Sequence, residues 1–202
     1  MVRYFHGREA RPASPRWNVA KTLGQTFVFW TLFLVVLPWA IHRLEDALGL
    51  AWWRFPGAPW RWAGAVLFLL GGTLGISSGL IMAIQGRGTP LPADCPRQLV
   101  VSGPYRYLRN PMAVAGLSQG VAVGLFLGSP AIIAYALIGG PVWQVFVRPW
   151  EEADLEQRFG EPYRRYRATV RCWLPRIPFP IPIPIPDATR GESHDETTSE
   201  HP

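Results

Sequence analysis

The sequence predicts an all-α integral membrane protein with about four transmembrane helices and a cytosolic C-terminal helical cap. Uncharged stretches run over residues 22–41, 62–84 and 111–147, and the charged residues are gathered between them. A helix needs about 20 consecutive apolar residues to cross a bilayer. The first two stretches therefore fit one crossing each. No alternation of strands and helices is visible, which argues against a nucleotide-binding α/β fold.

The first two stretches are interpreted as a retained anchor and a packing helix. Residues 1–21 precede the anchor as a basic cytosolic arm. The stretch 22–41 is longer than the core of a signal peptide, and no small-residue cleavage site follows it. The stretch 62–84 contains a run of glycine and serine over 71–79. Small residues let membrane helices approach closely, so we expect this run to pack against another helix.

The third stretch predicts a helical hairpin. Its 37 residues are too many for one crossing, and Gly-Ser-Pro at 128–130 interrupts it near the middle. We therefore expect two helices, over about 111–127 and 130–147, joined by a tight turn. Gly-Gly-Pro at 139–141 predicts a kink in the second of them.

The segment after the hairpin predicts two short helices. The first is expected to start near Pro149 and to end at Gly160, and the second to start at Pro162. In the second helix, Tyr163 and Tyr166 share one face and the arginines lie mostly elsewhere. This pattern is typical of an amphipathic helix that lies on a membrane surface.

The remaining segments lack apolar periodicity. Residues 85–98 are rich in glycine and proline and predict an irregular loop. Residues 177–202 are rich in proline and isoleucine and then acidic, which predicts a disordered tail. The folded membrane domain is accordingly expected to span 22–176.

The net charge of +6 follows the predicted topology. Most basic residues lie in three groups, before the first helix, between the second and third, and after the fourth: Arg3, Arg8, Arg11, Arg16 and Lys21; Arg87, Arg97, Arg106 and Arg109; Arg148, Arg158, Arg164, Arg165, Arg167, Arg171 and Arg176. The loop after the first helix has Arg43, Arg54 and Arg61 against Glu45 and Asp46. Positive loops stay on the cytosolic side. The pattern predicts a multi-pass protein with both termini in the cytoplasm, in the inner membrane if the source is bacterial. It argues against a nucleic-acid partner and favours contact with membrane lipids.

The cysteines and histidines indicate neither a disulfide nor a metal site. Cys95 and Cys172 both fall on the predicted cytosolic side, where a disulfide is not expected. The four histidines are scattered and lack the spacing of metal ligands.

Two charged and aromatic segments flank the predicted hairpin. Residues 103–112 read GPYRYLRNPM, and residues 151–166 read EEADLEQRFGEPYRRY. The hairpin returns both segments to one face of the membrane. That arrangement predicts a site where a water-soluble reagent meets a lipid-like molecule.

These two segments resemble the membrane methyltransferase family that includes isoprenylcysteine carboxyl methyltransferases and phospholipid N-methyltransferases. The resemblance covers about residues 65–175. The matching residues are Gly103, Tyr105, Arg109 and Pro111 in the first segment, and Arg148, Glu151, Glu152, Phe159, Gly160, Tyr163 and Tyr166 in the second.

The resemblance implies S-adenosylmethionine as co-substrate, bound on the cytosolic side. By position, the nucleoside would be lined by Arg97, Gln98, Leu99 and Val100. The rest of the cofactor would be enclosed by Tyr105, Arg109, Asn110, Pro111, Met112 and Ala113. Glu152 would hold the cofactor's ammonium group, and Arg148 would face the polar end of a small or lipid-like acceptor.

Two positions depart from the family pattern, and they keep a second class of function open. Asn110 stands where the family usually has His, and Ala113 where it usually has Tyr. Asn110 keeps a polar contact but cannot act as a base near neutral pH. The altered pair leaves open a non-catalytic membrane binding or assembly protein on the same scaffold.

The acceptor atom is also left open by the sequence. Arg148 favours a carboxylate acceptor, because its planar fork matches a carboxylate. An amine or thiol acceptor would require a base, and the sequence shows no obvious one. Simpler readings are that the pair Glu151 and Glu152 only marks a helix start and that Arg148 only reaches toward the membrane interface. The oligomeric state is not indicated.

Overall fold

The computed structural model describes residues 10–89 and 94–175, and all regular elements in these two ranges are helical. In chain order they are α1 (Pro15–Trp30), the π-helical turn η1 (Thr31–Val36), α2 (Leu37–Ala47), η2 (Leu50–Trp53), α3 (Ala58–Gln85), η3 (Gly103–Arg106), α4 (Pro111–Leu127), α5 (Pro130–Val142), the π-helical turn η4 (Trp143–Val147) and α6 (Arg148–Thr169). The predicted tail over 177–202 lies outside the described residues, as do the first residues of the basic arm.

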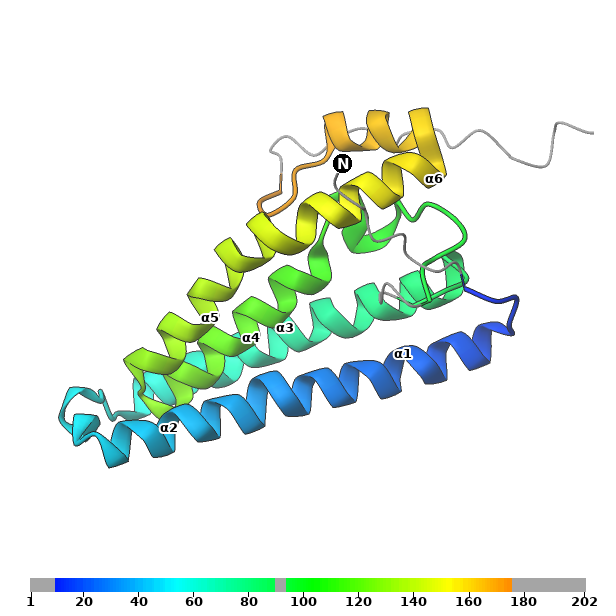
Figure 1. Cartoon of the computed structure of the whole chain (residues 1–202). Helices are drawn as coiled ribbons and strands as arrows, with labels where there is room; N and C mark the ends of the chain where they lie inside the picture. Colours follow the sequence, from blue (N-terminus) through cyan, green and yellow to red (C-terminus); the bar gives the residue numbers. More distant parts are fainter. Residues whose placement is uncertain (1–9, 90–93, 176–202) are drawn as a thin grey trace, which may run out of the picture.

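Four helical columns confirm the predicted fold class (Figure 1). Three are long and apolar enough to cross a membrane: Pro15–Ala47, Ala58–Gln85 and Pro130–Thr169. The fourth is the shorter apolar helix α4. The first column begins ahead of the apolar stretch, where the hydroxyl of Ser14 accepts a hydrogen bond from the backbone N–H of Trp17 at 3.2 Å. This N-cap starts α1 at Pro15, within the basic arm.

The hairpin is present, but the helix expected to start separately near Pro149 is not. Instead, α5, η4 and the first part of α6 run without interruption from Pro130 to the kink at Gly160. A proline inside a helix removes a backbone hydrogen bond. Pro141 lies just before the π-helical turn η4 and Pro149 just after it, so the wider turn accommodates both irregularities without ending the helix. The predicted break at Gly160 is confirmed by its φ of 55° and ψ of −129°.

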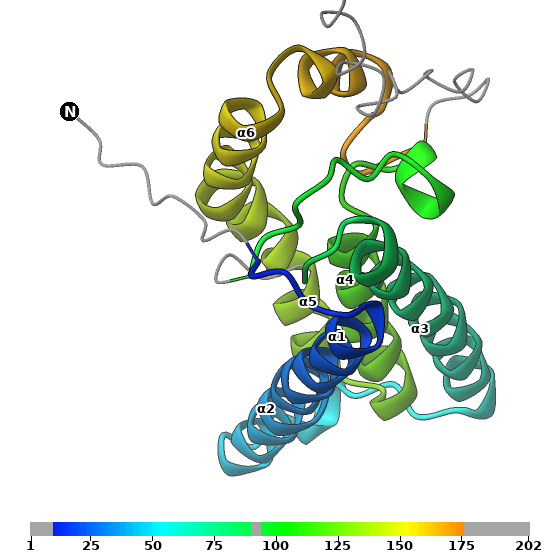
Figure 2. The same cartoon turned by 90° about the vertical axis from the view of Figure 1, so that its right-hand side faces the viewer.

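Close approach between backbones holds the membrane part together. Figure 2 shows α4 between α3 and α5. A Cβ atom added to Gly64 of α3 would lie 2.6 Å from the carbonyl oxygen of Ala122 in α4. On the other side of α4, a Cβ on Gly124 would lie 2.8 Å from the backbone nitrogen of Ile133. Within the predicted run over 71–79, a Cβ on Gly71 would lie 3.2 Å from the carbonyl oxygen of Ala115 in α4. The predicted packing role of this run is therefore confirmed.

The outer faces of the columns are apolar. Phe27 of α1, Leu69 of α3 and Leu137 of α5 are all more than 60% exposed. In water such faces would be unfavourable, whereas a bilayer solvates them and leaves the backbone hydrogen bonds inside each helix. The charged part of the third column begins at Arg148, so its membrane-spanning part is the apolar run over 130–147.

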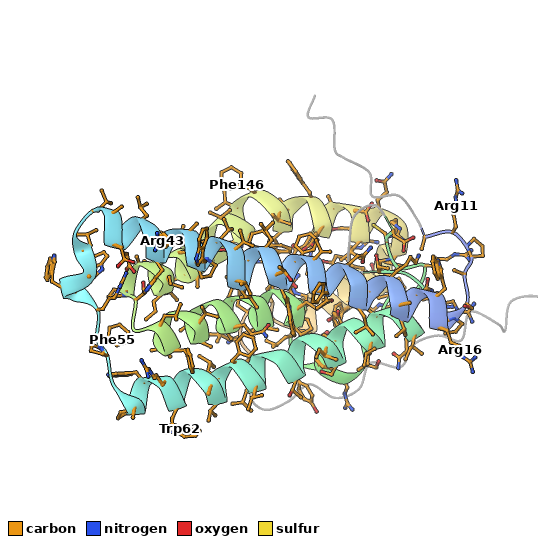
Figure 3. All side chains as sticks on the ribbon, turned by 90° about the horizontal axis from the view of Figure 1, so that it is seen from below. Arg11, Arg16, Arg43, Phe55, Trp62 and Phe146 are labelled. Carbon is orange, nitrogen blue, oxygen red and sulfur yellow. The ribbon has the colours of Figure 1, made fainter. Side chains whose placement is uncertain are left out.

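The columns have two chemically different ends, which Figure 3 shows from below. Arg11 and Arg16 mark one end, which also carries the charged helix α6; we call it the charged end. Arg43, Phe55 and Trp62 mark the other. Because Trp52, Trp53, Trp60 and Trp62 are exposed there, we call it the tryptophan end.

A buried carboxylate fixes the tryptophan end. The side chain of Glu45 at the end of α2 is 3% exposed. It accepts hydrogen bonds from Ser129 Oγ at 2.7 Å, from Trp53 Nε1 at 3.1 Å and from Arg54 at 3.3 Å. The backbone N–H of Phe55 also donates to the carbonyl of Gly128 at 3.0 Å. These contacts tie the α2–α3 connection to the α4–α5 turn.

Candidate functional site

The charged end has its own small hydrophobic core. Tyr163, Tyr166 and Val170 are buried, and Leu99, Val101, Leu155 and Phe159 pack against them. The hydroxyl of Tyr166 donates to the backbone carbonyl of Tyr105 at 2.7 Å. The tyrosine face of the last helical segment is therefore buried within the protein. The prediction that this segment is an amphipathic helix lying on the membrane surface was wrong, because its apolar face packs against the loop after α3.

Backbone contacts place Arg109 beside α6. The 3-10 turn η3 is entered through Gly103, whose φ of 55° favours glycine. Three residues beyond this turn, the backbone N–H of Arg109 donates to the carbonyl of Arg171 at 2.9 Å. The segment following α6 thus folds back along the segment preceding α4. Sequence reasoning had no signal for this pairing, because it joins residues far apart in the chain.

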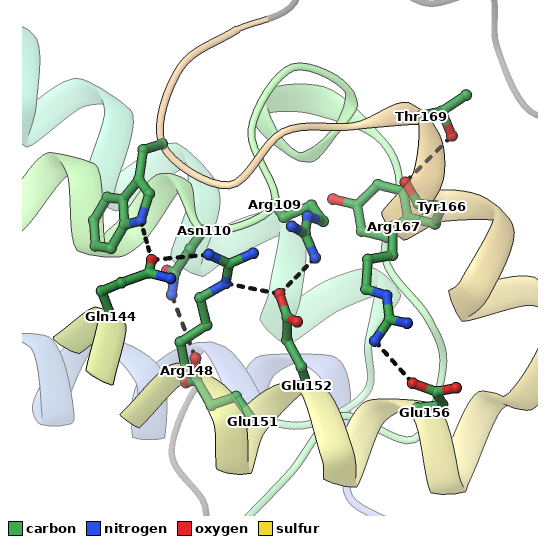
Figure 4. A network of polar contacts seen from close by, with 11 residues as sticks. Arg109, Asn110, Gln144, Arg148, Glu151, Glu152, Glu156, Tyr166, Arg167 and Thr169 are labelled. Atoms are coloured by element: carbon green, nitrogen blue, oxygen red, sulfur yellow. Dashed lines mark hydrogen bonds and ion pairs between the residues drawn. The ribbon is translucent and has the colours of Figure 1, made fainter. Parts of the chain in front are cut away.

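Arg109, Arg148 and Glu152 form an ion-pair centre, shown in Figure 4. Glu152 Oε1 accepts from Arg109 Nη1 at 2.5 Å and from Arg148 Nε at 2.8 Å. Arg148 and Glu152 lie one helical turn apart on the same face of α6, as their spacing allows. Both arginines bind the same oxygen, so neither of them binds Glu152 Oε2.

Gln144 accepts a hydrogen bond from a second nitrogen of the Arg148 guanidinium. Arg148 Nη1 donates to Gln144 Oε1 at 2.8 Å, and the same oxygen accepts from Trp173 Nε1 at 2.6 Å. Nε and Nη1 of Arg148 are thereby occupied, whereas Nη2 makes no hydrogen bond among the described residues. Sequence analysis missed both Gln144 and Trp173, which lie outside the two recognised segments.

Asparagine at position 110 has a structural role at the start of α4. It is the N-cap of α4: its side-chain oxygen accepts from the backbone N–H of Ala113 at 3.1 Å. Its amide Nδ2 lies 3.4 Å from Glu151 Oε2 and donates to it. Asparagine is among the best N-cap residues, and Pro111 suits the first helical position. The residue that departs from the family pattern therefore starts α4 and contacts the first glutamate of α6.

Glu151 lies in a different environment from its neighbour Glu152. Burial, together with the nearby charge of Glu152, raises the pKa of Glu151 from 4.5 to about 7. No arginine pairs with it among the described residues, and Asn110 is its hydrogen-bond donor. Burial and the charge of Glu151 also raise the pKa of Tyr105 above its usual range. Glu151 is thus a carboxyl group that can exchange a proton near neutral pH, which the sequence did not reveal.

A cavity of about 530 Å³ opens beside the ion-pair centre. It is lined by Arg109, Arg148, Arg167 and residues 168–174. Arg167 pairs with Glu156 at 2.8 Å. The cavity wall is therefore rich in arginine, which suits a ligand that carries anionic or strongly polar groups.

The other residues predicted from the sequence make different contacts. The backbone N–H groups of Arg97 and Gln98 both donate to the carbonyl of Gly86, at 2.6 and 3.2 Å. Leu99 packs in the hydrophobic core of the charged end, and Val100 is buried. The side chain of Met112 lies near Gly79 of α3. Of the predicted residues, the structure brings together Arg109, Asn110, Arg148 and Glu152.

The ion-pair centre fits the methionine part of S-adenosylmethionine, which carries an ammonium and a carboxylate. Arg109 Nε is buried and has no hydrogen-bond partner among the described residues. A carboxylate could accept from this nitrogen, while Glu152 Oε2 could accept from an ammonium. The described part of the chain contains no cluster of three or more residues that could hold a metal ion.

The comparisons with known proteins identify the class of this membrane protein. A sequence profile of the phospholipid methyltransferase family matches residues 60–162, about half of the chain. The chain belongs to this family. The matched range contains α3, the hairpin and both segments that meet at the ion-pair centre.

Structural similarity is more distant. The eukaryotic intramembrane Ras methyltransferase, isoprenylcysteine carboxyl methyltransferase, is 23% identical over 81% of this chain, with a TM-score of 0.47. The match covers 53% of that protein, so this chain spans about half of its length. No curated protein matches the chain at a significant level.

Proposed function

We propose that the protein transfers a methyl group from S-adenosylmethionine to a lipid-like amphiphile at the cytosolic membrane face. The observation that carries this proposal is the ion-pair centre of Arg109, Arg148 and Glu152 at the boundary of the apolar run. It offers groups of both signs at the depth where a water-soluble donor can reach a lipid. Membership of the phospholipid methyltransferase family supports the same chemistry.

For the donor, each residue of the centre has a proposed partner. Glu152 Oε2 accepts from the ammonium group and Arg109 Nε donates to the carboxylate. Arg97, Gln98, Leu99 and Val100 lie beside the nucleoside, and Tyr105, Asn110, Pro111, Met112 and Ala113 enclose the remainder. When bound, S-adenosylmethionine supplies a methyl group on a positively charged sulfur, which needs no further activation. The protein's task is then alignment and removal of water.

For the acceptor, Arg148 Nη2 and the arginine-lined cavity provide a polar contact. A carboxylate acceptor needs no base and would be held by Arg148 alone. A lipid amine is the second candidate, and Glu151 favours it. An ammonium group must lose a proton before its nitrogen can attack, and a carboxylate with a pKa of about 7 can take that proton. The nitrogen then forms a bond to the methyl carbon as the carbon–sulfur bond breaks.

Topology is part of the proposal. Both termini and the loop after α3 lie in the cytoplasm, and the tryptophan end faces the other side. Reporter fusions at Ala58 and Ser129 should be active on the outer side, and fusions after Gln98 on the inner side. An inner-side signal at Ser129 would contradict this orientation.

Donor binding is tested by substitution within the glutamate pair. Glu152→Gln keeps the shape of the side chain but removes its charge. A charge-assisted hydrogen bond is worth roughly 1.5–3 kcal/mol, so affinity for S-adenosylmethionine should fall about tenfold to a hundredfold in calorimetry. Glu161→Gln, an exposed change in the same helix, is the control and should leave affinity unchanged. No binding by the wild-type chain would instead favour a non-catalytic membrane protein.

The acceptor is tested by comparing Arg148→Lys and Glu151→Gln in membranes supplied with lipid carboxylates or lipid amines. Arg148→Lys keeps the charge but loses the planar fork. If the acceptor is a carboxylate, it should slow turnover, and Glu151→Gln should have little effect. If the acceptor is an amine, Glu151→Gln should abolish turnover and the wild-type rate should rise with pH through about 7. Unchanged rates in both variants would exclude this assignment of the acceptor site.

A further inference from the structure

A second cavity lies at the tryptophan end, opposite the ion-pair centre. Its volume is about 400 Å³. Its lining includes His42, Arg54 and Arg61. It also includes the apolar end of α4, over residues 125–127. A cavity lined by both cationic and apolar residues suits a ligand that has a polar and an apolar part.

The two arginines that line the cavity differ in their partners. Glu45 and Asp46 both pair with Arg54, at 3.3 and 2.9 Å. Arg54 also donates from Nη2 to the backbone carbonyl of His42, and His42 Nδ1 lies 3.6 Å from Glu45. Arg61 is exposed and makes no ion pair among the described residues. Arg61 is therefore the guanidinium at the cavity that is available to an anion.

The position of the cavity indicates where such an anion would come from. Trp52 and Trp62 at this end are 79% and 72% exposed. Exposed tryptophans gather where a membrane helix meets the lipid headgroups. The nearby Val66, Leu69 and Leu70 of α3 also expose apolar surface. A ligand at this depth would have its polar group among the headgroups and its apolar part along α3 and α4.

We propose that this cavity binds the phosphate of an anionic phospholipid in the leaflet opposite the methyl-transfer site. Arg61 supplies the main contact to the phosphate, and Arg54, held in place by Glu45, lines the same cavity. The acyl chains lie against the apolar end of α4. This site takes no part in the proposed methyl transfer, and it stabilises the turn that joins the two helices of the hairpin.

The test uses the purified full-length protein in an uncharged detergent. Thermal unfolding is followed by tryptophan fluorescence with added phosphatidylglycerol, phosphatidylcholine or inorganic phosphate. Ligand at about 100 times its dissociation constant should raise the melting temperature by roughly 5–10 °C for a chain of this size. Phosphatidylglycerol should give this shift, phosphatidylcholine a smaller one, and inorganic phosphate none.

Arg61→Gln is the diagnostic variant, and Arg43→Gln is its control. Arg43 is exposed at the same end but does not line the cavity. Arg61→Gln should weaken the apparent affinity for phosphatidylglycerol about tenfold or more, since a charge-assisted hydrogen bond is lost. Arg43→Gln should leave the affinity unchanged, and Arg61→Lys should restore most of it. The affinity for S-adenosylmethionine should be the same in all three variants, which separates this site from the proposed function.

The outcomes that overturn the proposal are distinct. Equal affinity for phosphatidylglycerol in the two glutamine variants would mean a general attraction to basic surface. An equal shift with inorganic phosphate would mean a site for free anions, and an equal shift with phosphatidylcholine would mean that headgroup charge is not recognised. If Arg61→Gln fails to fold, the bound lipid is instead analysed in purified Arg61→Lys and in an Arg61→Ala variant expressed at low temperature. Phosphatidylglycerol that co-purifies with the lysine variant but not with the alanine variant supports the site. Its equal presence in both excludes the site.

Discussion

Replacing Glu151 by Gln is expected to stabilise the protein, and to do so only at neutral and alkaline pH. The pKa of Glu151 is raised from 4.5 to about 7, chiefly by burial. In the unfolded chain this carboxyl group ionises near 4.5, so the folded state holds the proton more tightly. Between these two values the wild-type protein loses folding free energy as the pH rises, and above about 7 the full cost is present. Gln has the same shape, accepts from Asn110 and carries no charge.

The magnitude follows from the size of the shift. One unit of pKa corresponds to about 1.4 kcal/mol, so the variant should gain up to roughly 3 kcal/mol in free energy of unfolding at pH 8. For a chain of this size that is a rise of roughly 6–12 °C in melting temperature. At pH 4.5 the two proteins should melt together. The ten tryptophans make intrinsic fluorescence a suitable signal for melting in detergent.

The control is another glutamate of the same helix. Glu161 is exposed, and its pKa is lowered by hydrogen bonds from Arg164 and Arg165. Its contribution to stability is therefore present above its ordinary pKa and lost on acidification, which is opposite in sign to that of Glu151. Glu161→Gln should give a small loss of stability at neutral pH. A melting temperature of Glu151→Gln that exceeds the wild type equally at pH 5 and pH 8, or at neither, would refute a buried, neutral-range carboxyl at this position.

Three further changes test how the fold is held together. Glu45→Gln should lower the free energy of unfolding by roughly 3 kcal/mol in detergent melting, because it removes the buried negative charge that accepts from Arg54, Trp53 and Ser129. Gly64→Ala should cost about 1–3 kcal/mol by forcing α3 away from α4, while Gly116→Ala, with open space at its Cβ position, should cost nothing. Asn110→Ala should cost about 1 kcal/mol through loss of the α4 N-cap, with a matching fall in melting temperature.

The membrane part of the fold was predictable because it depends on composition over long windows. Uncharged runs of the right length, and a turn at Gly-Ser-Pro, are sufficient to define the helices and the hairpin, since a bilayer accepts little else. The junction at η4 was not predictable in the same way. Pro141 indicates a kink and Pro149 the start of a new helix, and only the π-helical turn between them shows that the column continues.

The candidate site was predictable only in part. Arg109, Arg148 and Glu152 could be named from two short segments, and they do meet. The contacts of Gln144, Trp173 and the backbone of Arg171 could not, because they depend on how the segment after α6 folds back. The face of Tyr163 and Tyr166 was identified correctly but assigned to the membrane, because periodicity shows that a face is apolar and not what covers it.

The two adjacent glutamates of α6 differ in the groups that contact their carboxylates. One oxygen of Glu152 accepts hydrogen bonds from two arginines, and its other oxygen makes none among the described residues. Glu151 is one residue away, yet an amide is its hydrogen-bond donor and its pKa lies near neutrality. Two carboxyl groups in such different environments are suited to different tasks, one binding cations and one exchanging a proton. A pair that merely marked a helix start would be solvated alike, and substituting either member would have the same small effect at every pH.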